Sequence, residues 1–242
     1  MIISAKTDVG LKRSTNQDAF DAKVLNDGLA WAIVCDGMGG QAAGNIASKI
    51  AVERITSAFL ENLSPKLNEK QLTTFLKAAA ESANMAIFEK ALSDEELSGM
   101  GTTLVCAVIK EENCLVAHAG DSRLYLFRDN CLIQMTSDHS VVQSMVDNGH
   151  LTEEEAKTHP SKNIITRALG VHNSVDVDIN DFVVKENDLI LLCSDGLTNC
   201  VDDAEITKVL MESEPENVSE ILISKANDGG GFDNITVVAI KI

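Results

Sequence analysis

The sequence predicts an α+β fold in which long helices cover an antiparallel sheet. Short runs rich in Val, Ile and Leu follow one another through short links, without a helix between each pair, and this order is typical of antiparallel strands. Two long amphipathic stretches in the first half each offer one apolar face to such a sheet. At 242 residues the chain has the size of one large domain, so we expect a single domain over residues 1–242.

The two long helices are expected at Ala43–Leu63 and Gln71–Leu92, where apolar residues recur mostly every three or four positions. Arg128–Cys131 has the composition of a hairpin turn, because Asp and Asn tolerate the backbone angles it needs. The strand-like runs are 29–35, 102–109, 114–119, 124–127, 189–193 and 235–242.

Residues 140–170 differ from the rest, because they are polar and have no sustained period. Gly149 is expected to end a short helix, and Thr152 with Glu155 forms a capping box that would begin another. This segment could be a flap over an active site or an ordinary surface insertion. Further on, Pro215 is expected to open the last helix.

Composition excludes several classes of protein. The net charge of −17 argues against a nucleic-acid partner, which needs a basic surface. The six cysteines show no CxxC spacing, and most lie in apolar runs, which fits a reducing compartment. The first residues do not resemble a secretory signal, and no apolar run is long enough to span a bilayer. We therefore expect a cytoplasmic protein without membrane insertion.

Three aspartates share a context that suggests a metal site. Asp36 and Asp195 each follow a hydrophobic strand and precede glycine, and Asp233 stands between a glycine loop and the last strand. Carboxylates gathered at the ends of strands repel one another unless a cation neutralises them. Oxygen ligands of this kind favour Mg²⁺ or Mn²⁺ over zinc. The alternative for any single copy is that Asp-Gly only forms a turn.

Other charged residues fit a phosphate-handling site. Arg13 lies five residues before Asp18, and a guanidinium can hold a phosphate with two hydrogen bonds. Asp121 and Arg123 follow another strand, where they could form an internal ion pair in a β-turn or contribute a metal ligand. The Gly37–Gly40 loop lacks the residues of a nucleotide-binding loop.

Taken in order, these segments resemble the bacterial type 2C protein phosphatases, the metal-dependent Ser/Thr phosphatases of the PPM family. The similar segments span nearly the whole chain: Arg13–Asp18, Val34–Gly40, Gly101–Thr103, Gly120–Arg123, Thr166–Gly170, Ser194–Gly196 and Phe232–Thr236. The resemblance implies a four-layer α-β-β-α sandwich with two Mn²⁺ or Mg²⁺ ions at one end. It also implies that residues 140–170 are the family's variable flap.

The resemblance further implies a role for each residue of the site. Asp36 would bridge both metals, the Gly37 carbonyl would bind the second, and Asp195 and Asp233 would complete the first. Asp18 would hold metal-bound waters, with Asn234 as a lesser supporting candidate. Arg13 would grip the substrate phosphate, and Asp121 would bind a third metal together with Asp195.

One departure concerns the general acid. Some relatives have His after the Asp-Gly pair, whereas this chain has Met38, which cannot donate a proton. Leaving-group protonation is then expected from elsewhere, such as a water on the metal. His139 is interpreted as structural or as part of the flap base, and none of the cysteines stands in the context of a nucleophile.

The resemblance implies a protein serine/threonine phosphatase, monomeric, that acts on phosphorylated proteins, a cognate Ser/Thr kinase among them. Two alternatives remain at this point: a phosphatase-like binding module without catalysis, and another two-metal hydrolase such as a small-molecule phosphatase or a nuclease.

Overall fold

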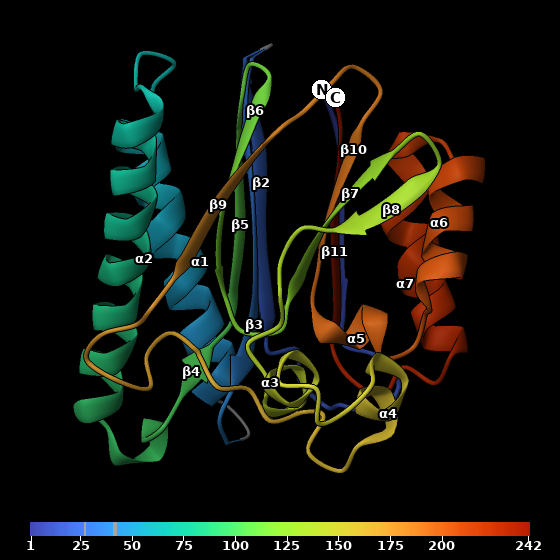
Figure 1. Cartoon of the computed structure of the whole chain (residues 1–242). Helices are drawn as coiled ribbons and strands as arrows, with labels where there is room; N and C mark the ends of the chain where they lie inside the picture. The colour runs from blue at the N-terminus through green and yellow to red at the C-terminus, as the bar shows by residue number, and fades with distance from the viewer. Residues whose placement is uncertain (27, 41–42) are drawn as a thin grey trace.

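Two antiparallel sheets pack face to face in the computed structural model, which describes residues 1–26, 28–40 and 43–242 (Figure 1). The first sheet has the order β1-β11-β10-β7-β8. Its strands are β1 (Ile2–Asp8), β7 (Arg123–Arg128), β8 (Cys131–Gln134), β10 (Leu189–Cys193) and β11 (Ile235–Lys241). The second sheet has the order β2-β3-β5-β6-β9, with β4 paired to β3. Its strands are β2 (Asp18–Asn26), β3 (Leu29–Met38), β4 (Gly101–Thr102), β5 (Leu104–Lys110), β6 (Asn113–Ala119) and β9 (Asp178–Val183).

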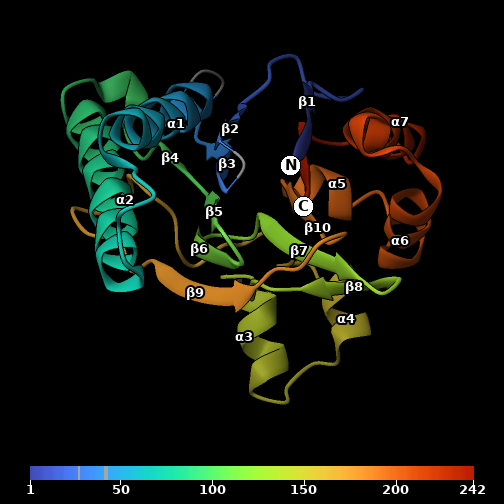
Figure 2. The ribbon, with the colours of Figure 1, turned by 90° about the horizontal axis from the view of Figure 1, so that it is seen from above.

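Two pairs of helices cover the outer faces of the sheets, as Figure 2 shows from above. On the second sheet lie α1 (Ala43–Asn62) and α2 (Glu69–Leu92), and on the first lie α6 (Asp203–Glu212) and α7 (Val218–Asp228). The predicted α-β-β-α sandwich is therefore confirmed. The remaining short helices are η1 (Glu95–Leu97), α3 (Val141–Asp147), α4 (Glu153–Thr158), α5 (Asp195–Thr198) and η2 (Pro215–Asn217). In the described part of the chain no helix has the length and apolarity that crossing a membrane requires.

The predicted elements agree with the structure, with small shifts at their ends. Gly149 has a φ of +71° after α3, and the capping box of Thr152 and Glu155 begins α4. The predicted turn at Asp129 and Asn130 has positive φ at both residues, as a two-residue hairpin requires. The run 102–109 is two strands, because the chain leaves the β-ladder at Thr103.

Several elements were not predicted, namely β1, β2, β8, β9, α5, α6 and η1. The four strands among them are the edge strands of the two sheets. One face of each meets solvent, so the hydrophobic pattern in its sequence is weak. The sequence Asp-Ile-Asn-Asp-Phe-Val of β9, for example, is only partly buried.

The alternation of side chains along each strand directs polar residues to one end of the space between the sheets. On β3, Trp31, Ile33 and Cys35 contact the helices, whereas Ala32 and Val34 face the opposite sheet. Continuing this period of two places Asp36 on the side between the sheets. By the same alternation, Asp18 lies two residues before Phe20 and Ser194 lies two residues after Leu192, so both are at this end of the layer between the sheets.

The contact between β3 and α1 depends on two glycines without side chains. A Cβ on Gly44 would lie 2.5 Å from the Gly37 carbonyl oxygen, and a Cβ on Gly37 would lie 2.0 Å from the Gly44 oxygen. We expect Gly44→Ala to lower the free energy of unfolding by about 1–3 kcal/mol, because overpacking outweighs the gain of about 1 kcal/mol in helix propensity. Urea denaturation measures this change.

Gly40→Ala is the matched control, because a Cβ there meets nothing within 4 Å. If Gly44→Ala were as stable as the wild type, or more stable, the close approach of β3 to α1 would not be a constraint.

Candidate metal centre

Five aspartates from separate elements converge at the end of the layer between the sheets. Asp36 lies near the end of β3 and its carboxyl group feels the charges of the other four, which are Asp18, Asp195, Asp121 and Asp233. In Figure 1 this is the lower end of the sandwich, where α3, α4 and α5 gather. The structure therefore brings together all the acidic residues singled out in the sequence, although it does not assign their roles.

The main chain of Asp36 is held on both sides by the Thr102-Thr103 pair. Its carbonyl oxygen accepts hydrogen bonds from the Thr103 amide (2.8 Å) and the Thr102 hydroxyl (2.9 Å). Its amide donates to the Thr103 hydroxyl (2.9 Å), which also bonds the buried Ser122 hydroxyl (2.7 Å). These groups fix the direction in which the Asp36 carboxylate points. Gly101–Thr103 is one of the segments that resemble the phosphatase family, but its role could not be inferred from the sequence.

The carboxylate of Asp18 links the two sheets. It comes from β2, and its Oδ2 accepts hydrogen bonds from the hydroxyls of Ser194 and Thr236, both at 2.7 Å, in the opposite sheet. The Thr236 amide in turn donates to the Ser194 hydroxyl at 2.9 Å. Asp18 is therefore anchored by two uncharged donors and has no neutralising cation among its hydrogen-bond partners.

Burial and mutual repulsion shift the acidity of these carboxyl groups. Burial, aided by the charges of Asp195 and Asp233, raises the pKa of Asp18 to about 7, although two hydroxyl hydrogen bonds oppose the shift. Burial, with the charges of Asp195 and Asp138, also raises the pKa of Asp121 to about 7. The pKa of Asp36 rises well above its ordinary value for the same two reasons. A site of this kind binds either protons or cations.

The donor set suits a hard divalent cation. Asp18 Oδ1 and Asp195 Oδ1 are both buried and have no hydrogen-bond partner, so two carboxylate oxygens lack the donor or cation that burial demands. Among the described residues no three Asp, Glu, His or Cys side chains are already gathered around one point as metal ligands. Two of the carboxylate oxygens that a metal could bind accept hydrogen bonds instead. Asn199 donates to Asp195 Oδ2 (2.9 Å), and Arg13 donates to Asp233 Oδ2 (2.7 Å).

Arg13 stands at the edge of this acidic cluster on a loop that Asn234 holds in place. The Asn234 amide group donates to the carbonyls of Val9 (2.9 Å) and Thr15 (3.0 Å), and its oxygen accepts the Gln17 amide (2.8 Å). The Arg13 side chain is 52% exposed and remains accessible to an anion from solvent. Asn234 therefore positions the loop that carries Arg13, a role that sequence reasoning missed.

The structure does not contain the ion pair between Asp121 and Arg123, which was one of the two interpretations of this segment. Arg123 bonds both carboxylate oxygens of Asp138, at 2.9 and 2.7 Å, and the Tyr125 hydroxyl at 3.1 Å. The carboxyl group of Asp121 instead lies close enough to Asp195 for their charges to interact. Nothing in the sequence around Asp138 indicated this pairing.

His139 connects residues 140–170 to the Asp121 loop. Its Nδ1 accepts the Gly120 amide (3.1 Å), and its own amide donates to the Gly120 carbonyl (2.8 Å). The ring proton then lies on Nε2, which is 3.1 Å from Asp178 Oδ2. Ser140 bridges Ile165 beside it, which closes the stem of the segment. His139 thus has a structural role at the stem of residues 140–170.

Neither Met38 nor the cysteines adds a reactive group to the site. The Met38 side chain packs over Gly101, where a Cβ would lie 2.8 Å from the methionine Cε. All six cysteines are free, and burial raises the pKa of the Cys35 and Cys193 thiols, the latter to about 12. These two thiols therefore remain protonated at neutral pH.

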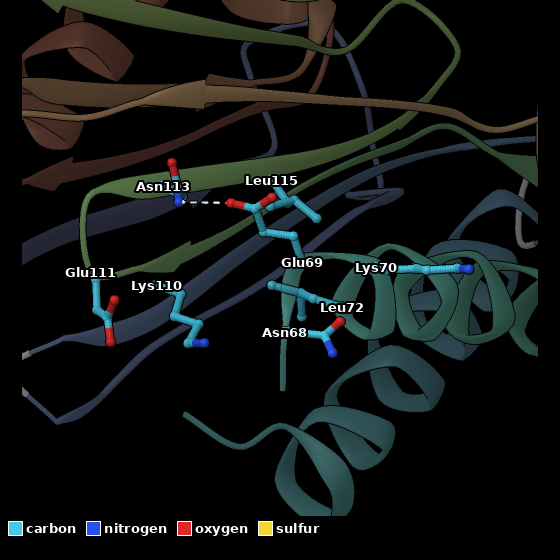
Figure 3. A pocket seen from close by; sticks show the side chains of 8 residues that line it. All are labelled: Asn68, Glu69, Lys70, Leu72, Lys110, Glu111, Asn113 and Leu115. Carbon is cyan, nitrogen blue, oxygen red and sulfur yellow. Dashed lines mark hydrogen bonds between the residues drawn. The ribbon is translucent and has the colours of Figure 1, made fainter. Parts of the chain in front are cut away.

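A separate hollow lies at the opposite end of the sandwich, between the start of α2 and the β5–β6 turn (Figure 3). Two of its charged groups already have partners, because Asn113 donates to Glu69 (3.2 Å) and Lys110 donates to the Leu67 carbonyl (2.6 Å). Lys110 pairs with Leu29 at the far end of β3, roughly 20 Å from Asp36 along the strand. This hollow therefore has no part in the aspartate cluster.

Comparison with known proteins agrees with the geometry. The family model described as protein phosphatase 2C matches residues 12–221. Protein phosphatase PhpP of Streptococcus pneumoniae is 40% identical over 243 residues, which cover 100% of this chain and 98% of that protein. The serine/threonine phosphatase of S. agalactiae superposes with a TM-score of 0.93 at 39% identity, over 100% of this chain and 99% of that one.

A further solved structure contains metal. The catalytic domain of the phosphatase PstP, in complex with two manganese ions, superposes with a TM-score of 0.85 at 37% identity, over 98% of this chain and 96% of that one.

The raised pKa values predict how the stability of the metal-free protein depends on pH. Because the pKa values of Asp18 and Asp121 rise from 3.8 to about 7, the folded protein retains protons that the unfolded chain releases between about pH 4 and 7. Stability is therefore greatest below this window and falls as the pH rises through 7. We expect protein treated with EDTA to melt at a lower temperature at pH 8 than at pH 6 in differential scanning calorimetry.

Asp18→Asn removes one of the repelling charges while keeping an oxygen for Ser194 and Thr236. We expect it to raise the melting temperature of the metal-free protein at pH 8 by several degrees, since about 1 kcal/mol corresponds to roughly 2–4 °C in a chain of this size. A lower melting temperature for Asp18→Asn at pH 8 would show that the carboxylates do not repel one another as described.

Two substitutions separate the contact of His139 with Gly120 from its contact with Asp178. In His139→Asn the amide oxygen replaces Nδ1 as the acceptor for Gly120, whereas His139→Gln reaches Asp178 but leaves the Gly120 amide without an acceptor. We expect His139→Gln to be less stable than His139→Asn by about 1–3 kcal/mol, the cost of an unsatisfied buried donor. Hydrogen exchange at the Gly120 amide should accelerate only in His139→Gln. Equal exchange rates in both variants would contradict the assigned tautomer.

Proposed function

The chain belongs to the protein phosphatase 2C family and is a serine/threonine protein phosphatase, and we propose that it works through two divalent cations held by Asp36, Asp195 and Asp233. The single observation that carries the proposal is the cluster of carboxyl groups at the end of the sandwich, in which Asp18 is buried and the others are partly buried. One oxygen of Asp18 and one of Asp195 have no hydrogen-bond partner, and the charges of the five groups repel one another. A pair of Mn²⁺ or Mg²⁺ ions would supply the missing positive charge.

Such a cation pair supplies Lewis-acid chemistry when bound, because it lowers the pKa of a water nucleophile and offsets charge on the phosphoryl oxygens. Asp36 is expected to bind both cations, and the Gly37 carbonyl is expected to bind the second. Asp195 and Asp233 are expected to complete the ligands of the first cation. The hydrogen bonds from Thr102 and Thr103 support this assignment, since they orient Asp36 before any ligand arrives.

Asp18 and Asp121 have supporting parts in the proposal. Two hydroxyls donate to Asp18 Oδ2, so only its unsatisfied Oδ1 is available to accept a hydrogen bond from a metal-bound water. This supports the proposal that Asp18 holds such waters and does not bind a cation directly. The charges of Asp121 and Asp195 interact, which supports the proposal that these two residues would hold a third cation.

Arg13 is proposed to bind the substrate phosphate. Its guanidinium is exposed and already bonds a carboxylate oxygen of Asp233, so it can exchange that anionic partner for a phosphoryl group. The proton for the leaving group comes from solvent in this proposal, because Met38 cannot supply one.

The proposed substrates are phosphoserine and phosphothreonine in phosphorylated proteins. A Ser/Thr kinase whose phosphorylation this enzyme reverses is expected among them, an inference from the family alone. The flap at 140–170 is proposed to border the bound protein, since its stem at Ser140 and Ile165 is joined through His139 to the Asp121 loop.

Asp36→Asn tests the metal site directly. We expect the rate of p-nitrophenyl phosphate hydrolysis in Mn²⁺ to fall at least roughly 10³-fold, because the bridging ligand of both cations is weakened. The variant should keep its fold, since the main-chain hydrogen bonds of Asp36 do not involve the carboxylate.

Asp129→Asn is the matched control, because Asp129 lies in the β7–β8 turn and Asn tolerates its φ of +52°. That variant should be as active as the wild type. Retained activity in Asp36→Asn would overturn the proposed site.

A further inference from the structure

Three exposed apolar side chains lie beside Arg13 and Asp233. Leu11 is 65% exposed, Phe232 is 61% exposed and Val9 is 36% exposed, and we refer to these three residues as the apolar rim. Leu11 precedes Arg13 by two residues, and Phe232 directly precedes Asp233. Isolated exposed apolar residues are common, but three on adjoining loops at one functional edge form a patch that indicates an interaction site.

The two loops that carry the rim are fixed to each other through their main chains. The amides of Leu11 and Lys12 both donate to the Gly231 carbonyl, at 2.8 and 3.2 Å. The Asn234 side chain donates to the Val9 carbonyl at 2.9 Å. Gly10, with a φ of +76°, comes so close to the Asp233 carbonyl that an added Cβ would lie 2.1 Å from its oxygen. The rim is therefore preorganised.

Leu11 and Phe232 rest on neighbouring glycines. A Cβ on Gly231 would lie 2.8 Å from the Leu11 Cγ, and a Cβ on Gly230 would lie 2.4 Å from the Phe232 ring. The two side chains thus lie next to adjacent glycines and turn most of their surface to solvent. Rigid, accessible apolar side chains of this kind bind a partner at little cost in conformational entropy.

We propose that Leu11 and Phe232 form a docking surface for an apolar side chain of the phosphoprotein substrate, close in sequence to the phosphorylated residue. The inference rests on the proposed function, because Arg13 beside the rim is taken as the phosphate-binding residue. The rim is continuous with that site through Leu11-Lys12-Arg13 and Phe232-Asp233. A phosphate bound at Arg13 therefore brings the neighbouring residues of the substrate over the rim.

The test compares substrates with and without neighbouring residues. The variants are Phe232→Ser and Leu11→Ser, and the matched control is Leu60→Ser, which removes a 55% exposed leucine near the far end of α1. The substrates are p-nitrophenyl phosphate and a set of phosphothreonine peptides in which each neighbouring position in turn is Leu or Ser. Each enzyme is assayed in Mn²⁺.

The wild type should prefer Leu over Ser at one or two positions of the peptide. Phe232→Ser and Leu11→Ser should each lower kcat/KM for the preferred peptide roughly 10-fold, in line with the transfer energy of a large apolar side chain, and abolish the preference. Hydrolysis of p-nitrophenyl phosphate should change less than twofold, and Leu60→Ser should match the wild type on every substrate.

Three outcomes would overturn the docking surface. One is a wild type without any preference for Leu, and another is an equal loss on p-nitrophenyl phosphate and peptides in Phe232→Ser. The third is a dimer in light scattering that Phe232→Ser dissociates, since a second copy of the chain would then cover the rim. A wild type inactive on p-nitrophenyl phosphate would instead overturn the proposed metal site. Peptide binding, measured by fluorescence anisotropy, would then test the rim separately.

Discussion

The repulsion among closely spaced, mostly half-buried carboxyl groups is the constraint on which the rest of this structure depends. The alternation of side chains on β2 and β3 places Asp18 and Asp36 at the end of the apolar layer between the sheets, where water cannot screen them fully. Hydroxyl groups satisfy part of Asp18, and main-chain hydrogen bonds fix Asp36, yet neither neutralises the charge. The fold thereby holds in place a cluster of like charges that protons or cations would stabilise, and this supports the proposal that the end of the sandwich is the metal site.

In the proposed function, different elements around the cluster would contact different parts of a substrate. Asn234 holds the loop of Arg13 against the last strand, so the expected phosphate-binding group belongs to the same rigid unit as Asp233. On the other side, His139 ties the stem of the flap to Gly120 and therefore to the Asp121 loop. A phosphorylated segment would meet rigid loops on one side and the flap on the other. The proposed docking surface lies on the rigid side.

The main layers and the aspartates could be predicted from the sequence, because both follow from short-range patterns. Asp36 and Asp195 each end a continuous apolar strand, and a period of two decides which way the next side chain points. The strands β1, β2, β8 and β9 could not be predicted, because half-exposed strands carry polar residues on one face. Contacts between residues far apart in the chain could not be predicted either, such as those of Arg123 with Asp138 and of Asn234 with Val9. Such pairs have no local pattern, since the fold alone brings them together.

The position of the cations tests the central claim most directly. Crystals of the protein soaked in Mn²⁺ give anomalous scattering that locates each ion independently of any assumed ligand. The account predicts two strong peaks at the end of the sandwich, both about 2 Å from carboxylate oxygens of Asp36, with Asp195 and Asp233 around one of them. Peaks only at exposed carboxylates elsewhere, or none near Asp36 at saturating Mn²⁺, would contradict it.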